Sequence, residues 1–521
     1  MAAAKKPAPF KNEQILDFSK PVNFNSQKEA IAKLRKKLGK THEIVIGEKK
    51  YKTKHTFNSI NPSNKDEVLA VFYKGTTELA GKAVETAHDT FKEWQYSPVE
   101  KRADILFSAA EIIKRRRFEV NAYLILEAGK NYAEADADTA ETIDFLNFYA
   151  REALRYAGRQ PVVPFKGEKN ELVYIPLGVC AVIPPWNFPL AILGGMTSAA
   201  IVAGNTVVLK PSSDTPLIGK LFYDIMVEAG LPAGVLNFLP GSGGEVGDTL
   251  VAHPKTRFIA FTGSMEVGIH INELAAKVQP GQIWLKRVIA EMGGKDSIII
   301  DADCDLDAAV DSVTAAAFGF QGQKCSACSR AIVDKAVYNE FVKKLKAKVE
   351  TLQVGPADEN FAIGPVINES AMKGILDYME FGGKEGKLLC GGFKAEGNGF
   401  FLEPTVFIDI APNAKLSLEE IFGPVLSVIK SKNFDDALKI ANNTMFGLTG
   451  SLYTNDRAKI DRAKKELLIG NLYFNRKCTG ALVGVHPFGG FNMSGTDSKA
   501  GGRDYLLLFT QAKLMSEKID V

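Results

Sequence analysis

Short apolar segments alternate with segments of helical periodicity from Val179 onward, and this alternation limits the possible folds more than any other feature of the sequence. The expected strands cover 179–183, 206–209, 235–239 and 258–261, and the expected helices cover 190–202, 216–229, 244–252 and 267–278. Strands and helices that alternate in this way form a parallel sheet with right-handed crossovers, which binds its ligands at the carboxyl ends of the strands. A second run of the same kind, from Ser297 to about Thr479, predicts a second α/β unit.

Segments outside these two runs are amphipathic or polar. The spacing of apolar residues predicts helices over 28–38, 79–94, 99–128 and 131–154. Residues 166–175 are expected to form a hairpin arm, and residues 504–521 form a tail that follows the second run.

The composition is that of an ordinary globular protein. A chain of 521 residues is too long for a single compact core. Its 64 Lys and Arg residues against 61 Asp and Glu residues leave a formal charge of +3, which gives no support for a nucleic-acid partner. Six cysteines are too few for a disulfide scaffold and no apolar leader precedes them, so we expect free thiols in a reducing cytoplasm.

The stretch 172–209 carries no charged residue and has to be weighed as a membrane span. A spanning helix needs about 20 continuous apolar residues. Here Pro176, Pro184, Pro185 and Pro189 divide the stretch into short pieces. We therefore expect a buried strand–helix–strand unit and no membrane partner.

Cys325 is the candidate nucleophile. It follows a glycine-broken segment, 318–322, and small residues before a thiol leave room for a substrate. Cys328 makes a C-x-x-C pair with it, so the pattern alone also fits a redox motif, half of a zinc site or an inert buried thiol. The six histidines show no ligand spacing to any cysteine, and we expect no metal.

Six short motifs place this thiol in context. They are Pro185-Trp-Asn-Phe-Pro189, Lys210-Pro-Ser212, Phe261-Thr-Gly-Ser264, Glu291-Met-Gly-Gly-Lys295, Gly322-Gln-Lys-Cys325 and Glu419-Glu-Ile-Phe-Gly-Pro424. In type, order and spacing they resemble the signatures of the aldehyde dehydrogenase superfamily, and the likeness runs from about residue 55 to 515. The resemblance implies an aldehyde dehydrogenase-like α/β fold, with a Rossmann-type NAD-binding domain, an α/β catalytic domain and a small β oligomerisation arm.

The domain boundaries are assigned on the same basis. Residues 1–160 and 179–289 are expected to form the NAD-binding domain with an N-terminal helical arm, and 290–485 the catalytic domain that carries the nucleophile. Residues 161–178 and 486–521 are expected to form the oligomerisation arm and tail. Relatives pair through such an arm, so the resemblance implies a homodimer or an assembly of dimers.

The resemblance also implies roles for three residues in the chemistry. The Cys325 thiolate attacks the aldehyde carbonyl, and the Asn187 amide and the Cys325 backbone N–H hydrogen-bond the resulting oxyanion. After hydride transfer, Glu291 activates the water that hydrolyses the thioester. Judged by itself, Glu291 also fits a surface glutamate before a Gly-Gly turn.

The cofactor contacts are implied mainly by the same motifs. Ser264, at a helix N-terminus, would meet the pyrophosphate, Lys210 the adenosine ribose, and Glu420 and Phe422 the nicotinamide ribose and ring. The other expected contacts are Ile183, Pro184, Trp186, Ser212, Ser213, Gly243, Gly247, Phe261, Thr262, Gly263, Val267, Met292 and Gly293. The turn 241–247 is a poor match to the dinucleotide fingerprint, because Val246 stands where a third glycine or alanine is expected.

Ser213 bears on the choice between NAD and NADP. Many NAD-selective relatives carry a glutamate at this position, which binds ribose hydroxyls and repels a 2′-phosphate. A serine does neither strongly, so we expect NAD as the main cofactor with measurable use of NADP.

Segments 282–291, 323–330 and 488–502 resemble one subgroup, the 1-pyrroline-5-carboxylate dehydrogenases, which oxidise L-glutamate γ-semialdehyde to L-glutamate in proline degradation. The resemblance implies that the N–H groups of Gly480 and Ala481, with the Ser326 hydroxyl, bind the substrate α-carboxylate. It also implies that Phe188 and Phe488 enclose the aliphatic stem of the substrate. Two alternatives stay open: another semialdehyde dehydrogenase, for succinate or glutarate semialdehyde, and a non-catalytic binding protein on the same fold.

Overall fold

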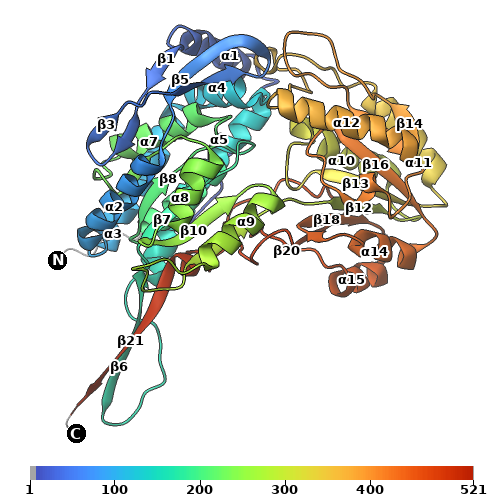
Figure 1. The fold of residues 1–521 in the computed structure, drawn as a ribbon. Coiled ribbons are helices and arrows are strands. Elements are labelled where there is room, and N and C mark those ends of the chain that lie inside the picture. The colour runs from blue at the N-terminus through green and yellow to red at the C-terminus, as the bar shows by residue number, and fades with distance from the viewer. Residues whose placement is uncertain (1–7, 520–521) are drawn as a thin grey trace.

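The computed structural model describes residues 8–519 and contains two large sheets of seven strands each (Figure 1). Helices cover both sheets, and a two-stranded arm extends away from the body of the molecule (Figure 1). This architecture confirms the expected α/β fold with two alternating runs.

The first sheet has the strand order β11-β10-β7-β8-β9-β2-β3. Its strands are β2 Ile44–Ile46, β3 Lys49–Tyr51, β7 Val179–Ile183, β8 Thr206–Leu209, β9 Leu236–Phe238, β10 Thr256–Thr262 and β11 Arg287–Glu291. Strands β7 to β11 pair in parallel, whereas β2 and β3 add an antiparallel edge. The chain runs outward from β7 to β8 and β9 and then places β10 on the other side of β7. The strand order therefore reverses between β7 and β10, where sheets of this kind bind ligands.

Both faces of this sheet are buried. Val179, Ala181 and Ile183 of β7 pack toward α2 and α9, while Cys180 and Val182 pack toward α6 on the other face. The helices around the sheet are α2 Thr77–Trp94, α6 Ala191–Val202, α7 Pro216–Glu228, α8 Asp248–Ala252 and α9 Met265–Ala276, with a π-helical turn, η1, at Gly243–Gly247. Burial of both faces explains why the strands read as continuous apolar runs.

The N-terminal helices differ from the sequence prediction in two places. They are α1 Pro21–Arg35, α3 Val99–Arg115, α4 Arg117–Ala128 and α5 Tyr132–Tyr156. The first begins earlier than expected, because Pro21 occupies its first turn, where proline loses no helical hydrogen bond. The single helix expected over 99–128 is two helices, since Arg116 leaves the helical conformation with φ −99° and ψ 18°. Apolar spacing continues across this break and so does not reveal it.

The second sheet has the order β14-β15-β16-β13-β12-β18-β19 and is parallel apart from the edge strand β14. Its strands are β12 Asp296–Ile300, β13 Cys328–Asp334, β14 Lys387–Cys390, β15 Thr405–Ile408, β16 Val425–Ser431, β18 Thr449–Tyr453 and β19 Asn471–Phe474. The helices around it are α10 Leu306–Phe318, η2 Gly319–Gly322, α11 Tyr338–Val349, η3 Ala357–Glu359, α12 Glu369–Glu385, α13 Lys415–Leu418, α14 Phe434–Asn442 and α15 Arg457–Glu466. Ile298 and Ile300 pack on one face of β12 and Ile299 on the other, so this sheet is also buried on both sides.

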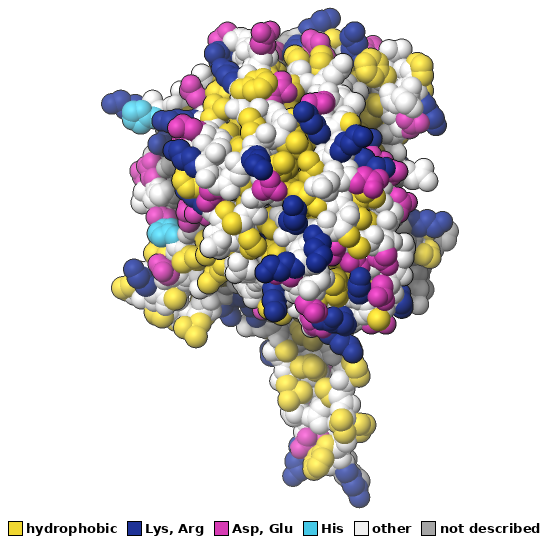
Figure 2. Space-filling model, turned by 90° about the vertical axis from the view of Figure 1, so that its right-hand side faces the viewer, with side chains coloured by type: hydrophobic (Ala, Val, Ile, Leu, Met, Phe, Trp, Pro, Cys, Tyr) yellow, Lys and Arg dark blue, Asp and Glu magenta, His cyan; other side chains and the backbone are white. Residues whose placement is uncertain are grey.

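The arm joins two distant parts of the chain. β6 (Glu168–Pro176) pairs antiparallel with β21 (Thr510–Lys518), after the short helix η4 (Tyr505–Phe509). The segment expected as a hairpin arm, 166–175, thus forms a two-stranded ribbon with the C-terminal tail, a pairing that the sequence pattern did not specify. Figure 2 shows apolar side chains on the arm. Leu514 on β21 is 61% exposed, and Val163, in the segment before β6, is 87% exposed.

Residues 40–73, to which the sequence analysis assigned no structure, add β1 (Lys40–His42), β4 (Thr56–Asn61) and β5 (Asn64–Tyr73) as a separate three-stranded sheet. A two-residue pair, β17 (Phe446–Gly447) with β20 (Phe491–Asn492), completes the strands. The uncharged stretch 172–209 forms the end of β6, then β7, α6 and β8, as expected. Among residues 8–519, no helix has the length and apolar character that a membrane crossing requires.

Candidate active site

Cys325 lies in the loop between η2 and β13. The chain turns into this loop through three consecutive left-handed residues, Phe320, Gln321 and Gly322, with φ values of 51°, 56° and 67°. Glycine at 322 also meets a second requirement, because a Cβ there would overlap the carbonyl of Gly423. The Glu134 carboxylate accepts the Phe320 N–H and so stabilises the unusual backbone. The turn separates the thiol from the preceding helix.

Two amide side chains hold the loop. The Gln323 Oε1 accepts the Ile367 N–H at 2.9 Å, and the Gln323 carbonyl accepts a hydrogen bond from Asn187 Nδ2 at 3.0 Å. An amide nitrogen carries two N–H groups, so Asn187 retains one donor beside the Cys325 loop.

Cys325 opens onto a cavity of about 880 Å³, open solvent at its mouth included. The residues expected from the sequence that line this cavity are Cys325, Glu291, Phe188, Ser326, Gly480, Ala481, Phe488, Thr262 and Met292. Burial and the nearby carboxylates of Asp296 and Glu420 raise the pKa of the Cys325 thiol well above its ordinary value. The thiol is therefore protonated at neutral pH and needs a base before it can react.

Glu291 is the last residue of β11 and is only 9% exposed, which rules out a surface glutamate. Its Oε1 accepts a hydrogen bond from Ser498 Oγ, and its Oε2 has no hydrogen-bond partner among residues 8–519. Burial raises the pKa of Glu291 to about 8, against the opposing effects of the Ser498 hydrogen bond and the Lys499 charge. A buried carboxyl group with a free oxygen and a pKa near neutrality is suited to general base catalysis.

Ser326, Gly480 and Ala481 bring small residues from two loops onto the same cavity. The carbonyl of Ser326 accepts hydrogen bonds from Cys478 Sγ and Thr449 Oγ1, each at 3.4 Å, and these bonds tie the Cys325 loop to the loop after β19 and to the start of β18. Gly480 has a φ of 80°, a conformation that favours glycine.

Two phenylalanines from distant parts of the chain, Phe188 and Phe488, line the cavity. The Phe188 ring lies edge-on to Phe320, with ring centroids 6.4 Å apart. The buried Lys130 ammonium lies 3.9 Å from the Phe188 centroid and pairs with Asp138 at 3.2 Å. These contacts fix Phe188 in place beside the thiol loop.

Three of the expected cofactor contacts lie at the carboxyl ends of neighbouring strands, since Ile183 ends β7, Lys210 follows β8 and Thr262 ends β10. Lys210 is 6% exposed, and its Nζ donates to the carbonyls of Gly241 at 3.1 Å and Pro211 at 3.3 Å. Burial lowers the pKa of Lys210 to about 8.

Residues around Lys210 differ in accessibility. Pro184 is buried, Ser212 is half-buried and accepts the Asp214 N–H, and Ser213 is exposed. Gly243 and Gly247 begin and end the π-helical turn η1, which departs from the turn of a dinucleotide fingerprint as the position of Val246 suggested.

The turn from β10 into α9 is closely packed against β11. Ser264 caps α9 by accepting the Val267 N–H, and the Gly263 N–H donates to the Glu291 carbonyl at 3.1 Å. A Cβ at Gly263 would meet the ring of Phe261, so the backbone has to pass this point without a side chain. Val267 is exposed at the start of α9.

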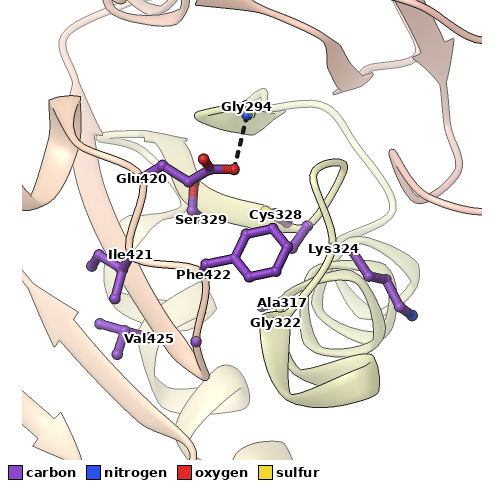
Figure 3. Close-up of a pocket in the computed structure, with 12 residues that line it drawn as sticks. Gly294, Ala317, Gly322, Lys324, Cys328, Ser329, Glu420, Ile421, Phe422 and Val425 are labelled. Atoms are coloured by element: carbon purple, nitrogen blue, oxygen red, sulfur yellow. Dashed lines mark hydrogen bonds between the residues drawn. The ribbon is translucent and has the colours of Figure 1, made fainter. Parts of the chain in front are cut away.

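Glu420 and Phe422 lie on the loop before β16. Figure 3 shows the Glu420 carboxylate directed at Gly294, whose N–H donates to it at 3.0 Å, and the Phe422 ring, which lines the same small pocket as Cys328. Burial raises the pKa of Glu420 to about 7. Phe422 also packs edge-on against Trp186, with centroids 5.3 Å apart, and the Glu420 carboxylate fills the space beside Gly293.

The match to known proteins extends over most of the sequence. The family model described as "Aldehyde dehydrogenase family" matches residues 49–515.

The chain belongs to the aldehyde dehydrogenase family.

Named relatives and solved structures agree with this assignment. A 1-pyrroline-5-carboxylate dehydrogenase from Geobacillus sp. strain WCH70 is 54% identical over 510 residues, which cover 98% of this chain and 99% of the relative. An Anoxybacillus flavithermus protein of the same name is also 54% identical over 510 residues, with the same coverage. A solved structure of 1-pyrroline-5-carboxylate dehydrogenase from Thermus with bound NAD has a TM-score of 0.97 and 47% identity, and covers 98% of this chain and 100% of that chain. These matches confirm the aldehyde dehydrogenase fold.

Several residues of this aldehyde dehydrogenase that line or support the cavity were not identified from the sequence. Glu141 of α5 lines it together with Phe145 and Tyr149, and burial raises the pKa of Glu141 to about 8. Ser498 hydrogen-bonds Glu291 from a loop 207 residues further along the chain, after the last strand of the second sheet. Glu141 lies in none of the segments that carry the resemblance, and Ser498 lies in one of them, 488–502, without an expected role. Only their place in the fold relates them to the reaction.

Proposed function

We propose that this aldehyde dehydrogenase oxidises L-glutamate γ-semialdehyde, the hydrolysed form of 1-pyrroline-5-carboxylate, to L-glutamate in proline degradation, with NAD as the hydride acceptor. The observation that carries the proposal is the single cavity onto which Cys325, Glu291, Ser326, Gly480 and Ala481 open. The cavity offers a nucleophile and a base for the aldehyde group of the substrate, and hydrogen-bond donors for its α-carboxylate. The relatives named 1-pyrroline-5-carboxylate dehydrogenase, 54% identical over nearly the whole chain, support the same substrate.

The first half of the reaction forms a thioester. Glu291, with a pKa of about 8, accepts the thiol proton, and the Cys325 sulfur bonds to the aldehyde carbon. The free N–H of Asn187 and the Cys325 backbone N–H are the donors for the resulting oxyanion. When bound, NAD supplies the hydride acceptor, and loss of the hydride leaves an acyl group on the Cys325 sulfur.

The second half hydrolyses this thioester. Glu291 takes a proton from water, the oxygen bonds to the acyl carbon, and the bond between this carbon and the Cys325 sulfur breaks to release the carboxylate product. The unpartnered Oε2 of Glu291 is free to bind that water. The same carboxyl group therefore acts as base twice, and its proton leaves to solvent in between.

The carboxyl ends of β8 and β10 fit a dinucleotide. Lys210 has three N–H donors and uses two of them on backbone carbonyls, so one is left for a ribose hydroxyl. The N-terminus of α9 offers the Ser264 O–H and backbone N–H groups to a pyrophosphate. Ser213 is exposed and uncharged, and for this reason we propose NAD as main cofactor with measurable use of NADP.

Succinate semialdehyde is the second candidate substrate, because it also carries a carboxylate, one carbon nearer to its aldehyde group, but has no ammonium group. Glu141 favours glutamate semialdehyde. It lines the cavity alongside Glu291, and a substrate ammonium beside it would compensate for its burial and favour its charged form.

The test compares kcat/KM for the two semialdehydes in the wild type and in Glu141→Gln. We expect the wild type to prefer glutamate semialdehyde by at least about tenfold, as one charge-assisted contact would give, and the variant to lose most of this preference. Glu111→Gln, which neutralises an exposed carboxylate on α3, is the control and should keep the preference. A higher wild-type kcat/KM for succinate semialdehyde would overturn the assignment.

The proposed roles of the thiol and the carboxylate are tested by stopped-flow measurement of NADH. Cys325→Ala should abolish oxidation and leave NAD binding intact, because it removes only the nucleophile. Glu291→Gln should lower both the NADH formed in the first turnover and the steady rate, because it keeps the shape of the side chain but removes the base that both halves of the reaction use. Steady turnover of Glu291→Gln near the wild-type rate would contradict the role of Glu291.

We further propose a homodimer, or an assembly of dimers, that works in the cytoplasm. The exposed apolar side chains of the arm support association, and the six free cysteines fit a reducing compartment.

A further inference from the structure

Arg476 lies between β19 and the loop whose N–H groups face the proposed carboxylate site. Its Nη2 donates to the carbonyl of Thr479 at 2.9 Å and to the carbonyl of Gly480 at 3.2 Å. Its Nε donates to the carbonyl of Lys477 at 3.3 Å. One guanidinium group therefore holds three carbonyl groups of a five-residue segment.

These bonds determine the direction of the N–H groups on the other side of the same peptide units. No peptide bond in residues 8–519 is cis, and in a trans peptide the C=O and N–H point in opposite directions. The Thr479 carbonyl shares its peptide unit with the Gly480 N–H, and the Gly480 carbonyl shares its unit with the Ala481 N–H. Gly480 and Ala481 line the cavity, whereas Arg476 does not. Holding both carbonyls away from the cavity directs both N–H groups toward it.

Arg476 is itself fixed by its surroundings. Its guanidinium lies 4.3 Å from the ring centroid of Tyr473, and its own carbonyl accepts a hydrogen bond from Ser451 Oγ at 2.5 Å. The loop is closed at its far end by His486, whose Nδ1 accepts the Leu482 N–H at 3.2 Å. A planar, pre-oriented guanidinium can satisfy several carbonyls at once, which the single ammonium of a lysine does not reproduce.

The hydrogen bonds from Arg476 matter because Gly480 gives this loop little conformational restriction of its own. Gly480 has a φ of 80°, and a Cβ built at this position meets no atom closer than 3.6 Å, so packing does little to hold its peptide units. A glycine in open space exchanges readily between backbone conformations. Without Arg476, the N–H groups would face the cavity for only part of the time.

We propose that Arg476 is a positioning residue that determines the preference for aldehydes bearing an α-carboxylate, by holding the Thr479 and Gly480 carbonyls so that the next N–H groups face the substrate. The inference rests on the proposed function of this cavity. Arg476 acts through the backbone and makes no contact with the reacting aldehyde group.

The experiment measures kcat and KM for glutamate semialdehyde and for propanal, an aldehyde without a carboxylate, in Arg476→Gln and Arg476→Lys. Both variants should lower kcat/KM for glutamate semialdehyde by about tenfold or more, mainly through KM, since loss of one to two hydrogen bonds to a charged group has an effect of this size. Values for propanal should stay within about twofold of wild type, which also shows that the variants fold. Lys477→Met is the matched control, because it removes an exposed charge from the same loop. It should leave the ratio of the kcat/KM values for the two aldehydes unchanged.

Two results would overturn the inference. One is an equal loss of kcat/KM for both aldehydes in Arg476→Lys, the milder variant, which would mean a general structural role. The other is a ratio of kcat/KM for glutamate semialdehyde to kcat/KM for propanal that is the same in Arg476→Lys as in the wild type, which would mean that the charge alone attracts the carboxylate. Failure of the proposed function is a different result, namely a wild type that oxidises propanal but not glutamate semialdehyde.

Discussion

At the residue scale, the pKa of Glu291 results from opposing effects of burial and of neighbouring polar groups. Burial raises its pKa to about 8, while the hydrogen bond from Ser498 and the Lys499 ammonium act in the other direction. Lys499 is held in place by the Gly470 carbonyl at 2.8 Å and by Asn471 Oδ1 at 3.2 Å. At pH 7, below its pKa, most of Glu291 is protonated. Hydrolysis limited by this base should therefore accelerate as the pH rises through about 8.

Replacement of Ser498 by alanine tests this balance. The variant loses a hydrogen bond that lowers the pKa of Glu291, so the pKa should rise and less carboxylate should be present at pH 7. A hydrogen bond to a charged group contributes about 1.5–3 kcal/mol, which predicts a rate of thioester hydrolysis at pH 7 lower by about tenfold or more. The pH–kcat profile should show this loss disappearing above the new pKa. A loss that is the same at every pH would contradict the explanation.

At the scale of the element, the loop after η2 depends on its left-handed residues. Gly322 combines a φ of 67° with close contact to the Gly423 carbonyl, so the turn that presents Cys325 has no room for a side chain. The contacts that surround this turn come from distant parts of the chain, namely Gly423 on the loop before β16 and the Glu134 carboxylate, which accepts the Phe320 N–H.

Gly322→Ala should therefore reduce both stability and activity. Left-handed strain and the overlap with the Gly423 backbone predict a loss of about 2 kcal/mol or more in the free energy of unfolding, together with displacement of the Cys325 loop. Thermal unfolding and kcat measure the two effects. Gly374→Ala is the control, because Gly374 lies inside α12 with open space at its Cβ position, and it should be neutral or slightly stabilising. A fully active and stable Gly322→Ala would disprove the steric argument.

At the scale of the whole molecule, the arm carries apolar side chains that the body of this chain does not cover. Val163 and Phe165 precede β6, and Leu514 lies on β21. Exposed apolar side chains on a protruding two-stranded ribbon are typical of an association surface.

Leu514→Glu combined with Val163→Glu should weaken the proposed assembly. Light scattering after size exclusion should show a lower molar mass than for the wild type, because burial of two carboxylates opposes association. Leu468→Glu, which changes an exposed leucine on the body, should leave the mass unchanged. A wild type that is already monomeric at micromolar concentration would refute the proposed assembly.

Local sequence was sufficient for much of the fold. The strand 206–209 is found as β8 with the same bounds, and the two alternating runs correspond to the two parallel sheets. The break at Arg116 and the pairing of β6 with β21 were not predicted. The first depends on one residue's backbone conformation within an unbroken apolar pattern, and the second on a partner strand at the other end of the chain.

The candidate site was likewise predicted only in part from the local sequence. Cys325, Glu291 and Asn187 stand in short motifs, and their residue types and order determined the expected chemistry from the sequence by itself. Only the tertiary structure decided that Glu141 lines the same cavity, that Ser498 hydrogen-bonds Glu291 and that Arg476 holds the loop of Gly480. Motifs are readable because their residues are adjacent in the chain. The pKa of a base or the direction of an N–H group depends on burial and contacts, which arise only when distant segments pack together.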